Sequence, residues 1–251
     1  MEMIIYSIIA LKTGPGQLNT VLNGMKGVSG NGLYAVTFNE IAAVVSDIGN
    51  IDFITDKSVA IEYAGVIEAL YQQFTLIPMR FGSIMGSTCP IIRMLERNYS
   101  EIQKNLQKVD NKFEFGLKVI CNSETLKTEL QSITAKDTST VTITSSETKN
   151  SIYRDYVNKK LQEHRLEDLL LGYVDSVITD ITRNLDRLNA INKFKRMLTA
   201  SIMVDSVFLL DKWRKDDLIE AVGDIQDHYP RLKFVMTGPW PPYNFVEITI
   251  K

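Results

Sequence analysis

The spacing of apolar residues divides the first half of the chain into short strands and two helices. The N-terminal run "MIIYSIIAL" is rich in β-branched residues and predicts a buried strand. The stretch "LYAVTFNEIAAVVSDI" predicts a hairpin that turns at Asn39-Glu40. A helix is expected over about residues 57–74, and another from a cap at Ser87 or Thr88 over residues up to about 109. The apolar face expected of the first helix comprises Ile61, Ala64, Ile67, Leu70 and Tyr71.

The second half predicts the order strand, long helix, one or two strands, helix, strand, strand. The run "FEFGLKVIC" is a strand, and "MLTASIMVDSVFLL" predicts one or two more. A helix over residues 211–229 is stopped by Pro230, and "RLKFVMTG" and "NFVEITI" are expected to close the fold as strands. The long helix is expected between "FEFGLKVIC" and "MLTASIMVDSVFLL". It has an apolar stripe at spacings of three and four, formed by Leu166, Leu169, Tyr173, Val177, Ile181, Leu185 and Leu188.

These elements predict an α+β protein of two domains. Residues 1–112 are expected to form an N-terminal α+β domain. Residues 113–251 are expected to form a C-terminal domain with the order of elements of a modified ferredoxin-like α/β sandwich. Residues 134–150 contain nine Ser or Thr among seventeen positions and predict a flexible segment within the second domain.

Composition excludes several classes of function. The 251 residues are 45% hydrophobic and 23% charged, with a net charge of −2, so no basic excess points to nucleic acid. No apolar run reaches the roughly 18–20 residues that cross a bilayer, and no signal peptide is evident. Cys89 and Cys121 form no CxxC pair. We therefore expect a soluble, reduced, cytoplasmic protein without disulfides.

The sequence contains no recognisable catalytic constellation. Its two histidines, His164 and His228, lie in separate predicted helices without a Cys or His at ligand spacing. The motifs of serine hydrolases, zinc proteases and P-loop proteins are missing. We therefore expect no catalytic residues, no metal site and no cofactor.

The segment "PMRFG" places Arg80 among apolar neighbours, followed by Phe81 and a glycine. If Arg80 is buried, its charge needs a partner, because an unpaired buried charge is very costly. Two interpretations stand: an ion pair that ties this segment to the helices, or a contact with an anion or a partner protein.

The segment "GPWPPYNF" near the C-terminus is rigid and aromatic. Pro241 and Pro242 restrict the backbone, so Trp240 and Tyr243 are held as rigid anchors. They are either an aromatic corner that locks the final strand onto the core, or a docking surface of the residue types that dominate protein interfaces. The segment offers no nucleophile, general base or metal-ligand set.

Three segments taken together resemble the GvpL/GvpF family of gas vesicle proteins. They are "LIPMRFGSIM", "FEFGLKV" and "GPWPPYNFV", supported by "IIYSIIAL" near the start and by "SIYRDYVNKKL" at the start of the long helix. The resemblance spans essentially the whole chain. It leaves open whether the chain is similar to the F-type or the L-type member.

The resemblance implies a structural role and no enzymatic activity. Proteins of this family are minor components or assembly factors of gas vesicles, thought to contact the small hydrophobic shell protein early in assembly, and the F-type member has been placed at the gas-facing side. The implied fold has two α+β domains, the second a modified ferredoxin-like domain with a variable region. The implied partners are the shell protein and other gas vesicle accessory proteins. A ligand-binding regulatory module of ferredoxin-like fold is the alternative.

Overall fold

The computed structural model describes residues 2–12, 14–49, 57–122, 151–197 and 202–248, with backbone alone for residues 151–167. It confirms an α+β fold with two antiparallel sheets and helices. The chain divides into two compact units, which are described separately. Unit 1 comprises residues 1–115, 209–212 and 238–251, and unit 2 comprises residues 116–208 and 213–237.

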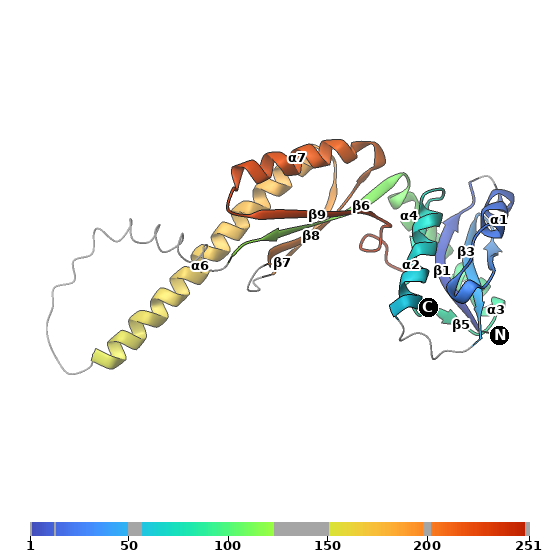
Figure 1. Cartoon of the computed structure of the whole chain (residues 1–251), viewed down its shortest axis with the longest axis horizontal. Helices are drawn as coiled ribbons and strands as arrows, with labels where there is room; N and C mark the ends of the chain where they lie inside the picture. The colour runs from blue at the N-terminus through green and yellow to red at the C-terminus, as the bar shows by residue number, and fades with distance from the viewer. Residues whose placement is uncertain (1, 13, 50–56, 123–150, 198–201, 249–251) are drawn as a thin grey trace. The chain divides into compact units, whose positions relative to one another are not determined.

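Unit 1 contains a five-stranded sheet within the described residues, with the order β2-β3-β1-β4 and with β5 also paired to β1 (Figure 1). Every interior residue of β1 is buried, and a register shift lies between Ile5 and Ser7. The predicted hairpin is confirmed, and Asn39 adopts a φ of 49° at its turn. The strands are β1 (Glu2–Ala10), β2 (Leu33–Phe38), β3 (Ile41–Ile48), β4 (Leu76–Pro78) and β5 (Ile84–Met85).

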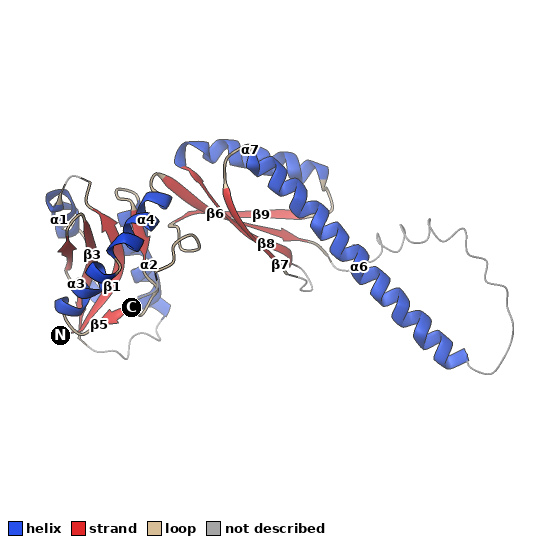
Figure 2. Cartoon of the chain, turned by 180° about the vertical axis from the view of Figure 1, so that it is seen from behind, coloured by secondary structure: helices blue, strands red, loops and turns tan. Residues whose placement is uncertain are grey.

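Helices cover both faces of this sheet (Figure 2). On one face, α1 (Pro15–Asn23) and α2 (Lys57–Tyr71) pack through Leu18, Leu22, Val66 and Ile67. On the other face, α3 (Thr88–Arg97) and α4 (Tyr99–Val109) pack through Ile91, Leu95, Ile102 and Leu106. The burial of both faces explains why β1 is continuously apolar in sequence. A short 3-10 helix, η1 (Val28–Gly30), precedes β2.

Two sequence predictions for these helices were wrong in detail. Ile61 was expected on the apolar face of α2, yet it is 73% exposed. At 3.6 residues per turn it points away from Tyr63, Val66 and Ile67, which define the buried face. The second predicted helix is divided into α3 and α4 at Asn98, whose Nδ2 donates to the carbonyl of Met94 at 2.8 Å.

The second sheet, described here with unit 2, has four strands in the order β7-β8-β6-β9. Helices α6 (Ser151–Asp186) and α7 (Lys215–His228) lie between its strands in the sequence. The elements follow one another as strand, helix, strand, strand, helix, strand, and the assignment to a ferredoxin-like class stays a prediction. The strands are β6 (Lys112–Ile120), β7 (Ile191–Arg196), β8 (Ile202–Asp211) and β9 (Lys233–Trp240), and η3 (Lys212–Arg214) follows β8.

The sequence missed β7 and placed a strand where the described chain has none. The segment "INKFKR" is an edge strand whose residues are exposed or half-buried, so it lacks the apolar pattern of a buried strand. The closing strand expected over "NFVEITI" is not formed over residues 244–248. The stripe of the long helix is confirmed for Val177, Ile181 and Leu185, which are buried, whereas Leu169 is 36% exposed. Leu188 is buried too, but it lies just after the end of α6. The segment 134–150, predicted to be flexible, lies outside the described residues.

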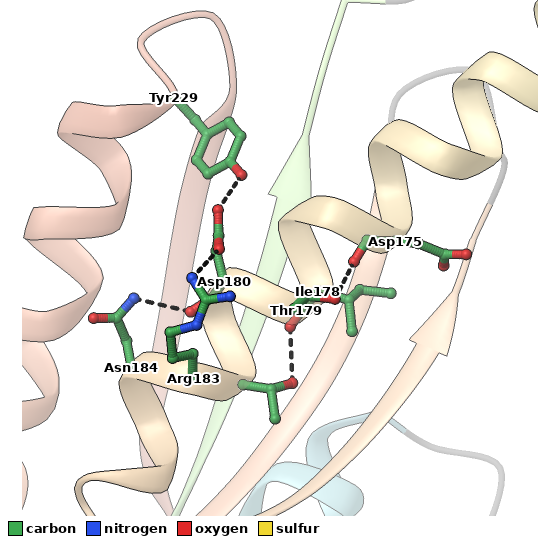
Figure 3. A network of polar contacts seen from close by, with 8 residues as sticks. Asp175, Ile178, Thr179, Asp180, Arg183, Asn184 and Tyr229 are labelled. Atoms are coloured by element: carbon green, nitrogen blue, oxygen red, sulfur yellow. Dashed lines mark hydrogen bonds and ion pairs between the residues drawn. The ribbon is translucent and has the colours of Figure 1, made fainter.

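A network of polar contacts fixes α6 to the residue that follows α7 (Figure 3). Asp180 accepts hydrogen bonds from Tyr229 Oη at 2.6 Å and from Arg183 at 3.1 Å. Partial burial and the Asp180 carboxylate raise the pKa of Tyr229 to about 12. Tyr229 is therefore a neutral donor at ordinary pH, and it links the ends of two helices that are far apart in sequence.

Candidate docking groove

Tyr63 on α2 holds the turn that follows β4. Its ring is buried, stacks on Tyr6 at a centroid distance of 4.9 Å and meets Phe81 edge-on at 5.2 Å. Its hydroxyl donates to the carbonyl of Ile5 at 2.7 Å and lies 3.0 Å and 3.2 Å from the carbonyls of Met79 and Arg80. Phe81 of the "PMRFG" segment is therefore partly buried and packs against the core.

Arg80 is not buried, so the condition under which its charge would need a partner within the fold does not apply. Its side chain is exposed, and within the described residues it takes part in no ion pair. The physical reason is local, because β4 ends at Pro78 and Arg80 lies in the turn beyond it, outside the sheet. The turn is fixed by the Arg80 carbonyl, which accepts from Ser83 Oγ at 2.7 Å. The backbone of Arg80 is therefore fixed in the turn, and its guanidinium is exposed.

The C-terminal segment, residues 241–248, belongs to unit 1, although the sequence placed it in the second domain. The buried carboxylate of Glu114 accepts hydrogen bonds from the Asn244 backbone N–H at 2.8 Å and from Asn244 Nδ2 at 2.6 Å. Lys108 on α4 donates to the carbonyl of Phe245 at 2.9 Å. These anchors lie on α4 and at the start of β6. The segment that follows β9 therefore packs within unit 1.

The "GPWPPYNF" segment has both buried and exposed side chains. Pro241, Pro242 and Phe245 are buried and form the packed corner. Trp240 and Tyr243 are each 42% exposed, so they project from the corner and are available for contact. The aromatic side chains are therefore presented on a rigid backbone, which lowers the entropy lost on binding.

The two segments singled out in the sequence line one groove of about 650 Å³ in unit 1. Its volume falls in the range of about 300–1,000 Å³ that is typical of ligand pockets. One wall is β4 with the turn after it, and the other is the C-terminal segment. The groove is lined by Ile77, Pro78, Met79, Arg80, Ser83, Tyr243, Asn244, Val246, Glu247 and Ile248.

The chemistry of the groove suits protein recognition better than catalysis. Its aliphatic side chains continue the core on the α3 and α4 face, where Met79, Val246 and Ile248 are partly buried. Burial, together with the carboxylates of Glu68 and Glu114, raises the pKa of Tyr243 to about 12, so its hydroxyl stays neutral. Arg, Tyr and Met, all present among the lining residues, are side chains enriched in protein interfaces.

The groups that sequence analysis considered for metal chemistry are dispersed. No group of three or more potential metal ligands occurs among the described residues. His228 Nδ1 lies 2.7 Å from the carbonyl of Asp224, whereas the side chain of His164 is outside the described part. Cys89 is exposed and Cys121 is buried. None of the helices in the described part is long and apolar enough to cross a membrane.

Sequence analysis found Arg80, Trp240 and Tyr243 but not the residues that position them. Tyr63, Glu114 and Asn244 act over long distances in sequence, since Asn244 lies 130 residues from Glu114. The one signal of these positioning contacts in the local sequence was Glu114, a charged residue near the start of the apolar strand "FEFGLKV".

The profile of the family described as "Gas vesicle synthesis protein GvpL/GvpF" matches residues 2–247. The chain belongs to this family. Gas vesicle protein F1 of Halobacterium salinarum is 23% identical over 230 residues, covering 90% of this chain and 87% of its own. Gas vesicle protein L of a Streptomyces species is 21% identical over 206 residues, covering 79% and 72%.

Solved structures agree with the fold of this GvpL/GvpF family member. The crystal structure of the gas vesicle protein GvpF from Anabaena sp. superposes with a TM-score of 0.76 at 18% identity, covering 99% of this chain and 97% of the other. Family membership assigns the chain a role in gas vesicles. Similarity to both F and L proteins leaves its subtype open.

Proposed function

We propose that this chain is a non-enzymatic accessory protein that binds the small hydrophobic shell protein of gas vesicles and supports nucleation and growth of the vesicle. The observation that supports the proposal most strongly is the groove, because it brings two family segments together in unit 1. Arg80 and Tyr243 line the groove and are exposed, and Trp240, which is also exposed, lies three residues before Tyr243 in the same segment.

The physical need for such a protein follows from the shell protein. A small subunit with a large apolar surface aggregates in water unless that surface is covered. A groove with aliphatic walls and a polar rim covers such a surface while it remains in water itself. Accordingly, we propose that the protein works in the cytoplasm and at the growing vesicle, with the gas-facing surface as one place for it to remain. Other gas vesicle accessory proteins are proposed as further partners.

Direct binding tests the proposal. The purified chain is titrated into shell protein freshly diluted from denaturant, while light scattering follows aggregation of the shell protein. We expect saturable binding that suppresses the scattering. If a folded chain shows no binding at tens of micromolar and no effect on scattering, the proposed function is wrong.

Two tryptophan variants supply matched controls, because the sequence has one tryptophan in each unit. Trp240→Ala is expected to weaken binding and to reduce stability by less than the roughly 3–5 kcal/mol of a buried aromatic, since its ring is 42% exposed. Trp213→Ala removes a ring that is 65% exposed on unit 2 and is expected to leave binding unchanged. Equal effects of both changes would contradict a role for Trp240 in binding.

A further inference from the structure

The second sheet has one face covered by helices and one open face. Arg196 on β7 forms an ion pair with Asp175 on α6 at 2.7 Å. The ring of Phe234 on β9 lies 6.3 Å from the ring of Tyr229, which directly follows α7. These contacts place α6 and α7 on the same face of the sheet, as Figures 1 and 2 show. Because side chains alternate along a strand, the residues next to Arg196 and Phe234 point to the opposite face, which none of the described helices covers.

The open face of unit 2 is basic. Lys118 of β6 is exposed between the buried Leu117 and Val119. It shares a face with β9, because a Cβ added at Gly116 would lie 2.7 Å from Thr237 Oγ1. Exposed lysines therefore reach the open face from three of the four strands, and they are Lys118, Lys193, Lys195 and Lys233. Among the described residues of unit 2, Asp205 of β8 is the one carboxylate on this face.

The outer side of α7 has the opposite charge. Leu218, Val222 and Ile225 are its buried residues and define the side that packs on the sheet. At 3.6 residues per turn, the other side carries four exposed carboxylates, those of Asp216, Glu220, Asp224 and Asp227. None of the four takes part in an ion pair with the described part of the chain. Like charges four residues apart destabilise a helix, so a basic surface laid on this acidic stripe relieves their repulsion.

The open basic face and the acidic stripe match in size and lie on opposite sides of unit 2. Asp216 and Asp227 are three helical turns apart, which separates them by about 16 Å. The outer strands β7 and β9 are three strand spacings apart, or about 14 Å. Each surface also has an exposed isoleucine, since Ile191 on the open face is 42% exposed and Ile219 beside the stripe is 46% exposed. One chain therefore carries both halves of a complementary contact.

We propose that the open basic face of unit 2 binds a second copy of this chain through the acidic stripe of that copy's α7. Two copies facing each other symmetrically through their open faces would oppose lysines to lysines, so the contact is head-to-tail. Each pair then keeps one unused basic face and one unused acidic stripe, and further copies add to form an open row. This inference goes beyond the proposed function and does not depend on binding of the shell protein.

The contact is expected to be weak and sensitive to salt. Its footprint on each copy is roughly a few hundred Å², below the roughly 800 Å² per partner of a stable interface. Attraction between exposed charges is screened over about 8 Å at physiological ionic strength, so low salt favours assembly. A row of copies repeats the groove of unit 1 along its length, which gives a growing vesicle several binding sites at once.

Sedimentation velocity of the whole chain tests the proposal directly. At about 0.02 M salt, the average mass is expected to rise with protein concentration beyond that of a dimer, and at about 0.5 M salt to return to that of a monomer. A monomer at every concentration up to several hundred micromolar, or a dimer that does not grow, would overturn the proposal. The same holds for a monomer whose open face binds polyglutamate or an RNA oligonucleotide, because that face then serves another anionic partner.

Two charge-reversed variants test the head-to-tail geometry. The sheet variant carries Lys118→Glu and Lys195→Glu, and the helix variant carries Glu220→Lys and Asp224→Lys. Each variant alone is expected to associate at least about 10-fold more weakly than the unaltered chain. Mixed together, they are expected to form a one-to-one complex that grows no further, because the intact stripe of the sheet variant meets the intact open face of the helix variant. Failure of the mixture to associate contradicts the proposal.

A matched control separates this contact from an effect of net charge. Arg93→Glu with Lys104→Glu changes exposed residues of unit 1 and alters the net charge as much as the sheet variant does, so self-association is expected to stay unchanged. Equal weakening in this control would refute the proposed contact. Unchanged unfolding midpoints show that the variants are folded. All of them are expected to retain shell-protein binding in dilute solution, since the groove lies in unit 1 and includes none of the changed residues.

Discussion

The hydroxyl of Tyr63 provides a direct test of how the core supports the groove. Tyr63→Phe keeps the ring, its stacking on Tyr6 and its edge-on contact with Phe81, and removes only the oxygen atom. The loss leaves the Ile5 carbonyl without its 2.7 Å donor in a buried site, and it releases the nearby carbonyls of the turn after β4.

The size of the effect follows from the burial of these groups. An intramolecular hydrogen bond contributes about 0.5–1.5 kcal/mol, and a buried polar group left unsatisfied costs about 1–3 kcal/mol. Tyr63 is 3% exposed, so water has little access to replace the lost donor. We therefore expect the free energy of unfolding of unit 1 to fall by about 1–3 kcal/mol.

The two tryptophans make the assay specific for each unit. In a Trp213→Phe background, Trp240 reports urea unfolding of unit 1, and in a Trp240→Phe background Trp213 reports unit 2. Tyr243→Phe is the control, because the structure shows no hydrogen bond from that hydroxyl to the described residues and the ring is 42% exposed. A loss below about 0.5 kcal/mol in Tyr63→Phe, or an equal loss in the control, would refute the reasoning.

Three further predictions concern packing and pH. Gly27→Ala sets a Cβ 2.6 Å from Tyr6 Oη, so it is expected to lower the free energy of unfolding in urea by about 1–3 kcal/mol. Gly32→Ala, whose Cβ meets nothing within 4 Å, is the control and is expected to be near neutral. Equal losses in the two variants would contradict the prediction. Burial acts to raise the pKa of Asp110, but hydrogen bonds from Lys12 and Thr75 outweigh it and lower that pKa. The resulting stability is present above the unfolded pKa of about 3.9 and is lost on acidification through the lower folded pKa; Asp110→Asn should flatten this acid dependence, and an unchanged profile would count against it. The raised pKa of Tyr229 gives stability that is present below about pH 10 and lost as pH rises towards 12, so Tyr229→Phe should remove that alkaline loss from the unfolding profile of unit 2.

The sequence determined the elements whose pattern is local. The continuous apolar run of β1, the hairpin at Asn39 and the helix over residues 215–228 all follow from spacing alone, because strand and helix periodicities place side chains on defined faces. The same reasoning failed for β7, an exposed edge strand with three basic residues, since little burial leaves little pattern. It also failed for Ile61, where an apolar residue at helical spacing lies on the exposed side.

Only the tertiary structure decided how the distinctive segments come together. The sequence identified "PMRFG" and "GPWPPYNF" but placed them in different domains, whereas both line one groove in unit 1. What decides this is a buried carboxylate, Glu114, that needs donors and finds them in Asn244, 130 residues away. Contacts over such separations leave no trace in local periodicity. The sequence therefore identified the two segments but not the groove that they form together.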